Sequence, residues 1–166
     1  KEIEIRKKQS LQAKPIDSSD LMQEIIEQIK DPNANYRKQS LHFFVYNILP
    51  GTTDAAVKKA AFLKDITLDR ISINEIPPKF AFELLSHMKG GPSVQVLIDL
   101  VLEGTAKTAS LAGTILKKQV FLYDSDFKRL SYAFQQGNKS AEDIIKSYAK
   151  GEFFTTLPPV DERIEV

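Results

Sequence analysis

Apolar residues recur at every third or fourth position along most of the chain, the spacing that gathers side chains on one face of an α-helix. Residues 94–102 show this most clearly, because Val94, Leu97, Ile98 and Val101 fall on one stripe. The spacing predicts helices over residues 20–30, 36–49, 54–66, 78–88, 94–102, 107–123, 125–136 and 140–149. Alternation of the strand type is limited to a connection at 67–76 and to residues 162–166. The pattern therefore predicts an all-α protein.

Residues typical of helix ends separate the predicted segments. Ser18 or Ser19 is expected to cap the first helix and Ser93 the fifth, because a serine hydroxyl accepts a hydrogen bond from a first-turn amide. Gly137-Asn138 is a typical C-terminal stop for the seventh helix. Ser140 begins a sequence similar to a capping box and is expected to start the eighth.

The predicted helices are joined by short connections that contain proline and glycine, which favours antiparallel pairing of successive helices. Four pairs of about 40 residues each have the period of HEAT-type helical repeats, which stack into an α-solenoid. No residue-level repeat relates the pairs. We therefore expect a HEAT-like array of about four antiparallel helix pairs, with a helical bundle of another topology as the alternative.

The sequence changes character near its C-terminal end. Leu157-Pro158-Pro159 stops the helical pattern, and polar and apolar residues then alternate over 162–166. We expect one HEAT-like helical domain over residues 1–157, followed at 158–166 by a linker and the start of another domain.

The chain has 166 residues and no cysteine. Disulfides, thiolate zinc sites, cysteine nucleophiles and iron–sulfur ligands supplied by this chain are therefore excluded. No segment reaches the roughly 18 uninterrupted apolar residues of a membrane helix. The first residues are mixed in charge and lack the apolar core of a secretory signal. We therefore expect no membrane association and a cytoplasmic location.

A search for catalytic and ligand-binding patterns is negative. His42 and His87 have no second histidine at the spacing of metal ligands, so a surface or packing role is favoured. Gly90-Gly91 lacks the third glycine and the Lys-Ser/Thr pair of a phosphate loop, which favours a helix stop. Ser86 and His87 are neighbours that point about 100° apart on a helix, too far for a nucleophile and its base. The sequence therefore predicts no catalytic, cofactor-binding or metal-binding residue.

Paired basic residues raise one further possibility. Aligned on one face, they would form a ridge that meets the phosphates of RNA, with Tyr123 and Tyr132 as stacking groups. The ridge would consist of Lys58, Lys59, Lys117, Lys118, Lys128 and Arg129. With 23 Lys+Arg against 22 Asp+Glu, the solvated faces of amphipathic helices explain the pairs better.

Several short motifs follow one another along nearly the whole chain. They are Pro50-Gly51-x-x-Asp54-x-Ala56, Lys59-Ala60-x-Phe62-Leu63, Ala81-x-Glu83-Leu84-Leu85-x-x-Met88-x-Gly90-Gly91, Leu97-Ile98-Asp99, and Gly137-Asn138 through Ser147-x-Ala149-x-x-Glu152-x-Phe154 to Pro158. These motifs resemble the N-terminal region of the bacterial aconitate hydratase B family, the bifunctional aconitases and 2-methylisocitrate dehydratases. Their order is more specific than any one of them.

The resemblance implies that this is the HEAT-like first domain of a larger enzyme of the tricarboxylic acid cycle. In that family, citrate and isocitrate interconvert through cis-aconitate on a 4Fe-4S cluster whose cysteines lie in later domains. No catalytic or cluster-binding residue of the family therefore falls on this chain. The implied role is association: packing beside the catalytic core, contact with a second subunit, and mRNA binding.

We therefore expect a noncatalytic interaction domain whose partners are the remaining domains of the parent enzyme, with a homodimer as a further possibility. The candidate contact residues are the turn Gly90, Gly91 and Pro92, which allows close backbone approach, and the aromatic pair Phe153 and Phe154. The alternative is a regulatory module that binds mRNA through the paired basic residues. A free-standing enzyme is the least supported reading, because the sequence supplies no base, nucleophile or metal set.

Overall fold

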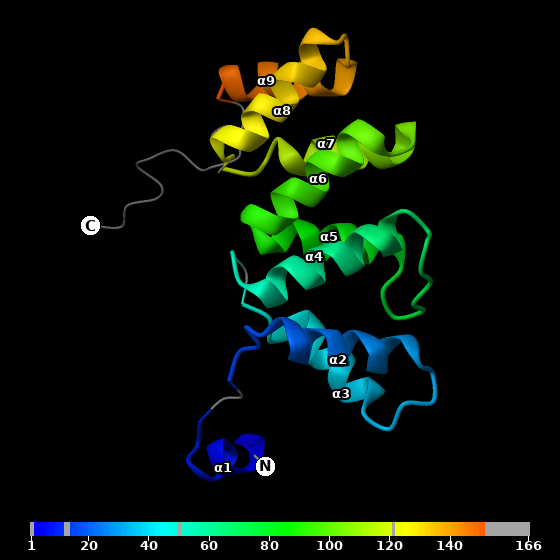
Figure 1. Cartoon of the computed structure of the whole chain (residues 1–166), viewed down its shortest axis with the longest axis vertical. Coiled ribbons are helices and arrows are strands. Elements are labelled where there is room, and N and C mark those ends of the chain that lie inside the picture. Colours follow the sequence, from blue (N-terminus) through cyan, green and yellow to red (C-terminus); the bar gives the residue numbers. More distant parts are fainter. Residues whose placement is uncertain (1, 12–13, 50, 121, 152–166) are drawn as a thin grey trace, which may run out of the picture. The chain divides into compact units, whose positions relative to one another are not determined.

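A computed structural model of the chain describes residues 2–11, 14–49, 51–120 and 122–151. Within these residues the backbone forms nine α-helices (Figure 1). In chain order they are α1 (Glu2–Lys8), α2 (Ser19–Lys30), α3 (Arg37–Tyr46), α4 (Asp54–Thr67), α5 (Pro78–Met88), α6 (Gly91–Glu103), α7 (Ala106–Leu116), α8 (Asp124–Gln135) and α9 (Lys139–Ala149). The predicted all-α class is confirmed. Helix α1 was not expected from the spacing.

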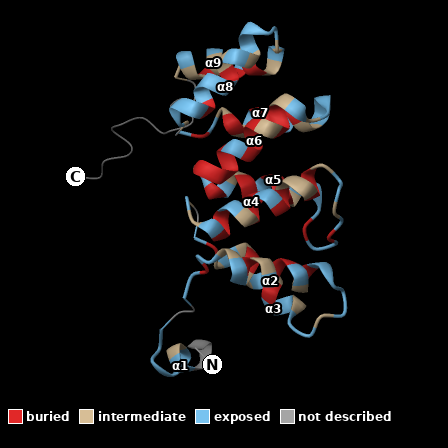
Figure 2. Cartoon of the chain, in the orientation of Figure 1, coloured by how far each residue is buried: buried red, intermediate tan, exposed pale blue. Residues whose placement is uncertain are grey.

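Helices from α2 onward pack as consecutive pairs, each helix against the next one along the chain. The pairs are α2 with α3, α4 with α5, α6 with α7, and α8 with α9. The predicted pairing is therefore confirmed. Figure 2 shows that buried residues gather on the sides of the helices that face one another, as amphipathic helices require.

The chain divides into two compact units, Lys1–Met88 and Lys89–Val166. In the first unit, α4 packs against both α2 and α5. The face of α4 is rich in alanine, and Ala55, Ala56 and Ala60 are almost completely buried. Their small side chains let neighbouring helices approach closely, while Phe44 of α3 meets Phe62 of α4 edge to face with ring centroids 5.5 Å apart.

Helix α6 forms the centre of the second unit and contacts α7, α8 and α9. Its residues are buried on nearly every side, including Leu97 and Ile98. On α7, small residues again face the packing partners: Ala112 is fully buried, and a Cβ at Gly113 would sit in ordinary contact with Ile144 of α9 and Val101 of α6. Each unit thus has its own apolar core.

Several predicted helix boundaries are wrong. The helix predicted over 107–123 ends at Leu116, because the amide of Gln119 turns back to the Leu116 carbonyl at 2.9 Å. Helix α6 begins at Gly91 rather than at residue 94, since Pro92 is favourable in a first helical turn. Thr67 is the last residue of α4, and the connection over residues 68–76 consists of turns, bends and irregular backbone in place of an extended segment.

The strand-like pattern at 162–166, the predicted linker at 158–166 and the aromatic residues Phe153 and Phe154 lie outside the described residues. None of the described helices combines the length and the apolar content that a membrane crossing requires. The described chain contains one isolated parallel bridge, in which Ile16 pairs with Ile48 and fastens the segment before α2 to the end of α3.

Candidate interaction surfaces

The Gly90-Gly91-Pro92 turn joins α5 to α6 at the boundary of the two units. Its backbone is left-handed at Gly90 (φ +150°) and Gly91 (φ +28°), which favours glycine. The Gly90 carbonyl accepts a hydrogen bond from the hydroxyl of Ser93 at 2.9 Å. Gly91 and Pro92 are buried, and Gly90 is half-buried. Of these three residues, only Gly90 is partly exposed.

Lys58 and Lys59 of the first unit differ in environment. Lys58 is half-buried, and its Nζ donates to Oε1 of Gln23 at 3.3 Å. Lys59 is 5% exposed, and its Nζ donates to the Val45 carbonyl at 3.3 Å and lies 5.2 Å from the centre of the Phe44 ring. Only Lys58 therefore presents part of its side chain at the surface.

Burial lowers the pKa of Lys59 to about 8, because the charged ammonium loses its hydration. The Val45 carbonyl is among the last of α3, and such carbonyls have no partner within the helix. A lysine at this position satisfies that carbonyl and places positive charge at the negative end of the helix dipole. The geometry therefore gives Lys59 a structural role in holding α4 to the end of α3.

The basic residues of the second unit are largely paired with acids. Lys117 forms an ion pair with Asp143, and Lys128 Nζ lies 2.6 Å from an oxygen of Asp124 on the same helix. The other pairing joins α8 to α6, where Arg129 Nη2 donates to Asp99 at 2.6 Å. Lys118 is exposed.

These pairings matter for nucleic-acid binding because a phosphate would have to compete with a carboxylate already in place. Exposed pairs of this kind are individually weak, so they reduce the local positive potential more than they stabilise the fold. The predicted RNA ridge is therefore divided between two units, with one lysine buried and three cations neutralised nearby.

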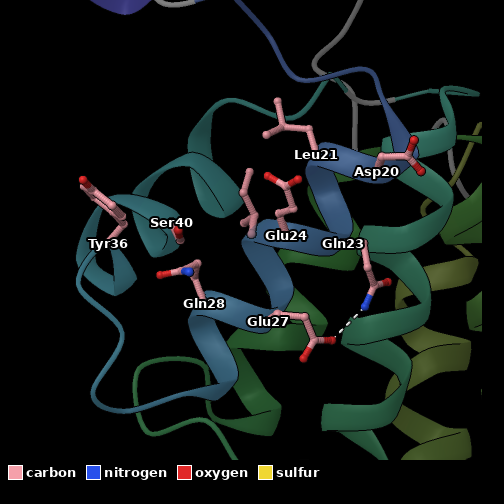
Figure 3. A pocket seen from close by; sticks show the side chains of 9 residues that line it. Asp20, Leu21, Gln23, Glu24, Glu27, Gln28, Tyr36 and Ser40 are labelled. Atoms are coloured by element: carbon pink, nitrogen blue, oxygen red, sulfur yellow. Dashed lines mark hydrogen bonds between the residues drawn. The ribbon is translucent and has the colours of Figure 1, made fainter. Parts of the chain in front are cut away.

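A hollow of about 580 Å³ lies between α2 and α3, and the sequence analysis did not find it (Figure 3). We call it the α2–α3 groove. It is lined by Asp20, Leu21, Gln23, Glu24, Ile25, Glu27 and Gln28 of α2 together with Tyr36 and Ser40 at the start of α3.

A second, wide hollow of about 530 Å³ is formed mainly by α8 and the turn that follows it. Arg129 and Tyr132 lie in its wall, and Tyr132 is 66% exposed. Asn138 also lines this hollow, but its side chain already caps α9 by accepting from the Ala141 amide at 3.0 Å.

The two histidines are placed as packing or surface residues. His42 is exposed on α3, and its ring lies 5.0 Å from that of Tyr46. His87 is exposed at the end of α5. Among the described residues no group of three or more histidine, aspartate or glutamate side chains is arranged to hold a metal ion.

These observations define an all-α protein of paired helices. Comparison with known proteins identifies its family, because residues 1–154 match the model of the aconitate B N-terminal domain. The chain belongs to this family.

Relatives of known name agree with this assignment. The chain is 30% identical over all of its 166 residues to "Aconitate hydratase B" of Salmonella typhimurium, and it spans 19% of that protein. It is 29% identical over the same length to the protein of that name from Escherichia coli K12. A third, from Synechocystis, is 32% identical over 145 residues, which are 86% of this chain and 16% of the relative. The chain thus spans about a fifth of the length of these relatives.

Proposed function

We propose that this chain is the noncatalytic N-terminal interaction domain of an aconitase B-type hydro-lyase, which packs on the catalytic core and mediates protein association. The match of residues 1–154 to the family's N-terminal domain carries the proposal. The chain corresponds to 19% of relatives that are named as whole hydratases, so most of such a protein lies in other domains. Paired helices are a suitable scaffold, because stacked pairs present extended binding surfaces.

The parent enzyme would interconvert citrate and isocitrate through cis-aconitate on a 4Fe-4S cluster. Such clusters are held by cysteine thiolates, and this chain has no cysteine. The residues of the chain therefore do not fit the cluster, and its ligands would come from other domains of the parent. This division supports a binding role for the chain over a chemical one.

The proposed contact surface follows from how the helix pairs would stack. A HEAT-like stacking of the four helix pairs would expose one curved face to the catalytic core. Gly90 in the turn before α6 is a candidate contact, and Phe153 and Phe154 are candidates outside the described residues. A homodimer through the same domain is a further form of association that the proposal includes.

The proposal is tested in two arms. The chain alone, treated with iron and sulfide, is assayed for conversion of cis-aconitate, and no turnover above buffer is expected. The full-length parent is then treated with an amine-reactive cross-linker and digested for mass spectrometry. Cross-links from Lys118 or Lys128 to the catalytic domains are expected. Turnover by the chain alone, or cross-links confined to this segment, would contradict the proposal.

RNA binding is the second candidate function. Arg129 and the exposed ring of Tyr132 line one hollow, in which a base can stack on the ring while a phosphate competes with Asp99 for Arg129. The substitutions Lys118→Ala and Tyr132→Ala should each weaken RNA binding, with a steep dependence on salt. Titration with labelled single-stranded RNA at low salt decides this point, since absence of binding there removes the candidate.

A further inference from the structure

The α2–α3 groove is used neither by the helix packing nor by the residues considered above. We propose that it binds a basic amphipathic segment of a partner protein, in which an apolar side chain is flanked by lysine or arginine. The inference rests on the proposed role in association and names the chemistry of one partner surface. Its support comes from the apolar walls of the groove, the charge at its rim and one polar atom that lacks a partner.

The walls of the groove are mainly apolar, and the hollow is open to solvent. Leu21 of α2 is 45% exposed and Tyr36, the residue before α3, is 66% exposed, while Ile25 of the lining is buried. Figure 3 shows Leu21 on α2 and Tyr36 at the start of α3. A volume of about 580 Å³ lies within the range of roughly 300 to 1,000 Å³ that is typical of binding pockets. An apolar side chain inserted here would bury both walls.

The rim of the groove carries acidic side chains of α2. Asp20 and Glu24 lie one helical turn apart on α2 and are both exposed. Glu27 is different, because it accepts hydrogen bonds from Lys30 at 3.2 Å and from Gln23 at 2.7 Å. Asp20 and Glu24 therefore set the local charge, which attracts a cation and repels a phosphate.

Three cations near the groove already have acceptors: Lys58 donates to Gln23, Lys30 to Glu27, and Arg37 to Glu75. Among the described residues no cation is paired with Asp20 or Glu24, so the charge of these two acids is available to a ligand in the groove. A basic segment matches this field, whereas an acidic segment or a nucleic acid does not.

Gln28 supplies a polar contact within the groove. Its Oε1 is buried and has no hydrogen-bond partner among the described residues. An unpaired buried acceptor costs about 1 to 3 kcal/mol, which a donor brought by a ligand would recover. Lysine and arginine side chains carry only donors, so a basic partner satisfies both this oxygen and the acidic rim.

The groove is held open by contacts outside it. Arg37, next to Tyr36, donates from Nε to the Ile29 carbonyl at 3.0 Å and thereby joins the start of α3 to the end of α2. Its guanidinium also pairs with Glu75, and Nη2 donates to that carboxylate at 2.8 Å. Two parallel hydrogen bonds fix the geometry of such a pair. The two walls are therefore positioned before any ligand arrives, which reduces the entropy cost of binding.

The test measures binding of the whole chain to a labelled 14-residue helical peptide built from leucine and lysine. A second peptide, with every lysine replaced by glutamate, is the charge control. Glu24→Lys and Tyr36→Ala should each weaken binding of the basic peptide by about tenfold or more. The matched controls Glu83→Lys and Tyr46→Ala remove an exposed acid on α5 and an exposed tyrosine at the far end of α3, and should change affinity less than twofold.

Circular dichroism checks that each variant is folded. If Glu24→Lys does not fold, Glu24→Gln replaces it in the binding measurement. Equal binding of both peptides, or equal effects of the groove and control variants, would overturn the inference. Light scattering reports whether a second copy fills the groove instead: self-association that Tyr36→Ala abolishes would also overturn it. If the chain binds the basic peptide as expected but the parent gives no cross-links to the catalytic domains, the proposed function is refuted and the inference about the groove stands.

Discussion

Lys59 is a buried cation that donates a hydrogen bond to the Val45 carbonyl. Burial of its charge destabilises the folded state, whereas the hydrogen bond stabilises it. The folded state holds this lysine with a pKa of about 8, against an ordinary value of 10.5. Between these pH values the folded state binds fewer protons than the unfolded state, so the free energy of unfolding rises with pH. Below pH 8 both states are protonated, and the full cost of burying the charge remains.

We therefore predict that raising the pH from 7.5 to 10 increases the free energy of unfolding by an amount on the order of 2 to 3 kcal/mol from Lys59. Lys59→Met should abolish this rise, because methionine does not titrate and fills a similar volume. Urea denaturation at a series of pH values measures the effect. Lys58→Met is the matched control and should keep the rise; if Lys59→Met keeps it too, the assignment to Lys59 is wrong.

Tyr148 joins α9 to the end of α7 through one hydroxyl. The hydroxyl lies 2.8 Å from the carbonyl oxygen of Leu116 and also contacts that of Gln119. Burial raises the pKa of Tyr148 to about 12, since the phenolate would lose its hydration. The single hydrogen of the hydroxyl serves one of these carbonyls at a time, and the Leu116 carbonyl also accepts from the Gln119 amide.

Tyr148→Phe should therefore destabilise the chain by about 1 to 2 kcal/mol, because it leaves the carbonyl of Leu116 without this donor. The raised pKa also determines how stability depends on pH. Between pH 10 and 12 the folded state binds more protons than the unfolded state, so the contribution of Tyr148 to the free energy of unfolding falls as the pH rises. Thermal unfolding at pH 7 measures the first effect. Tyr132→Phe is the control on an exposed ring and should change stability by less than about 0.5 kcal/mol.

At the scale of single elements, the sequence predicts helix ends best where the chemistry is local. Gly137 has a φ of +85°, its amide donates to the Phe134 carbonyl at 2.8 Å, and the Asn138 amide donates to Ala133 at 3.0 Å. This is the Schellman arrangement that glycine after a helix predicts. Ser18 likewise caps α2 by accepting from the Leu21 amide at 3.3 Å.

Predictions fail where more than one residue can cap a helix or where packing decides. Asn138, rather than Ser140, caps α9. Ser93 was expected to cap α6 but lies inside its first turn, because Pro92 lets the helix begin earlier. The α2–α3 groove depends on how two helices pack, and periodicity along one helix carries no information about the space between two.

Gly137→Ala tests whether the left-handed backbone at Gly137 ends α8. A Cβ at Gly137 would meet nothing within 4 Å, so the cost comes from the backbone conformation alone. Alanine at φ +85° should destabilise the chain by about 1 kcal/mol, and Gly137→Asn should cost less because asparagine tolerates this region. Chemical denaturation compares the two. Equal stability of the alanine variant and the unchanged chain would contradict the left-handed stop.

At the scale of the whole molecule, the numbers of positive and negative side chains are almost equal. The formal net charge is +1, and ion pairs distribute it over both units. A neutral surface of this kind suits contact with other protein domains better than contact with a polyanion.

The separate cores of the two units lead to a prediction about cooperativity. Leu63 in the first unit and Leu97 in the second are both completely buried. Each replacement by alanine should cost about 2 to 5 kcal/mol through lost burial and the cavity left behind. If each unit opens through its own core, Leu97→Ala accelerates amide hydrogen exchange in residues 91–149 and leaves residues 19–88 unchanged.

Leu63→Ala is the reciprocal control and should accelerate exchange only in residues 19–88. Mass spectrometry of peptic fragments separates the two ranges in a single experiment, because each fragment reports on one unit. Faster exchange in both ranges from either substitution would mean that the chain opens as one cooperative body. Exchange confined to the altered unit would instead allow an interaction partner to stabilise one helix group without ordering the other, which is how a docking domain can respond locally to binding.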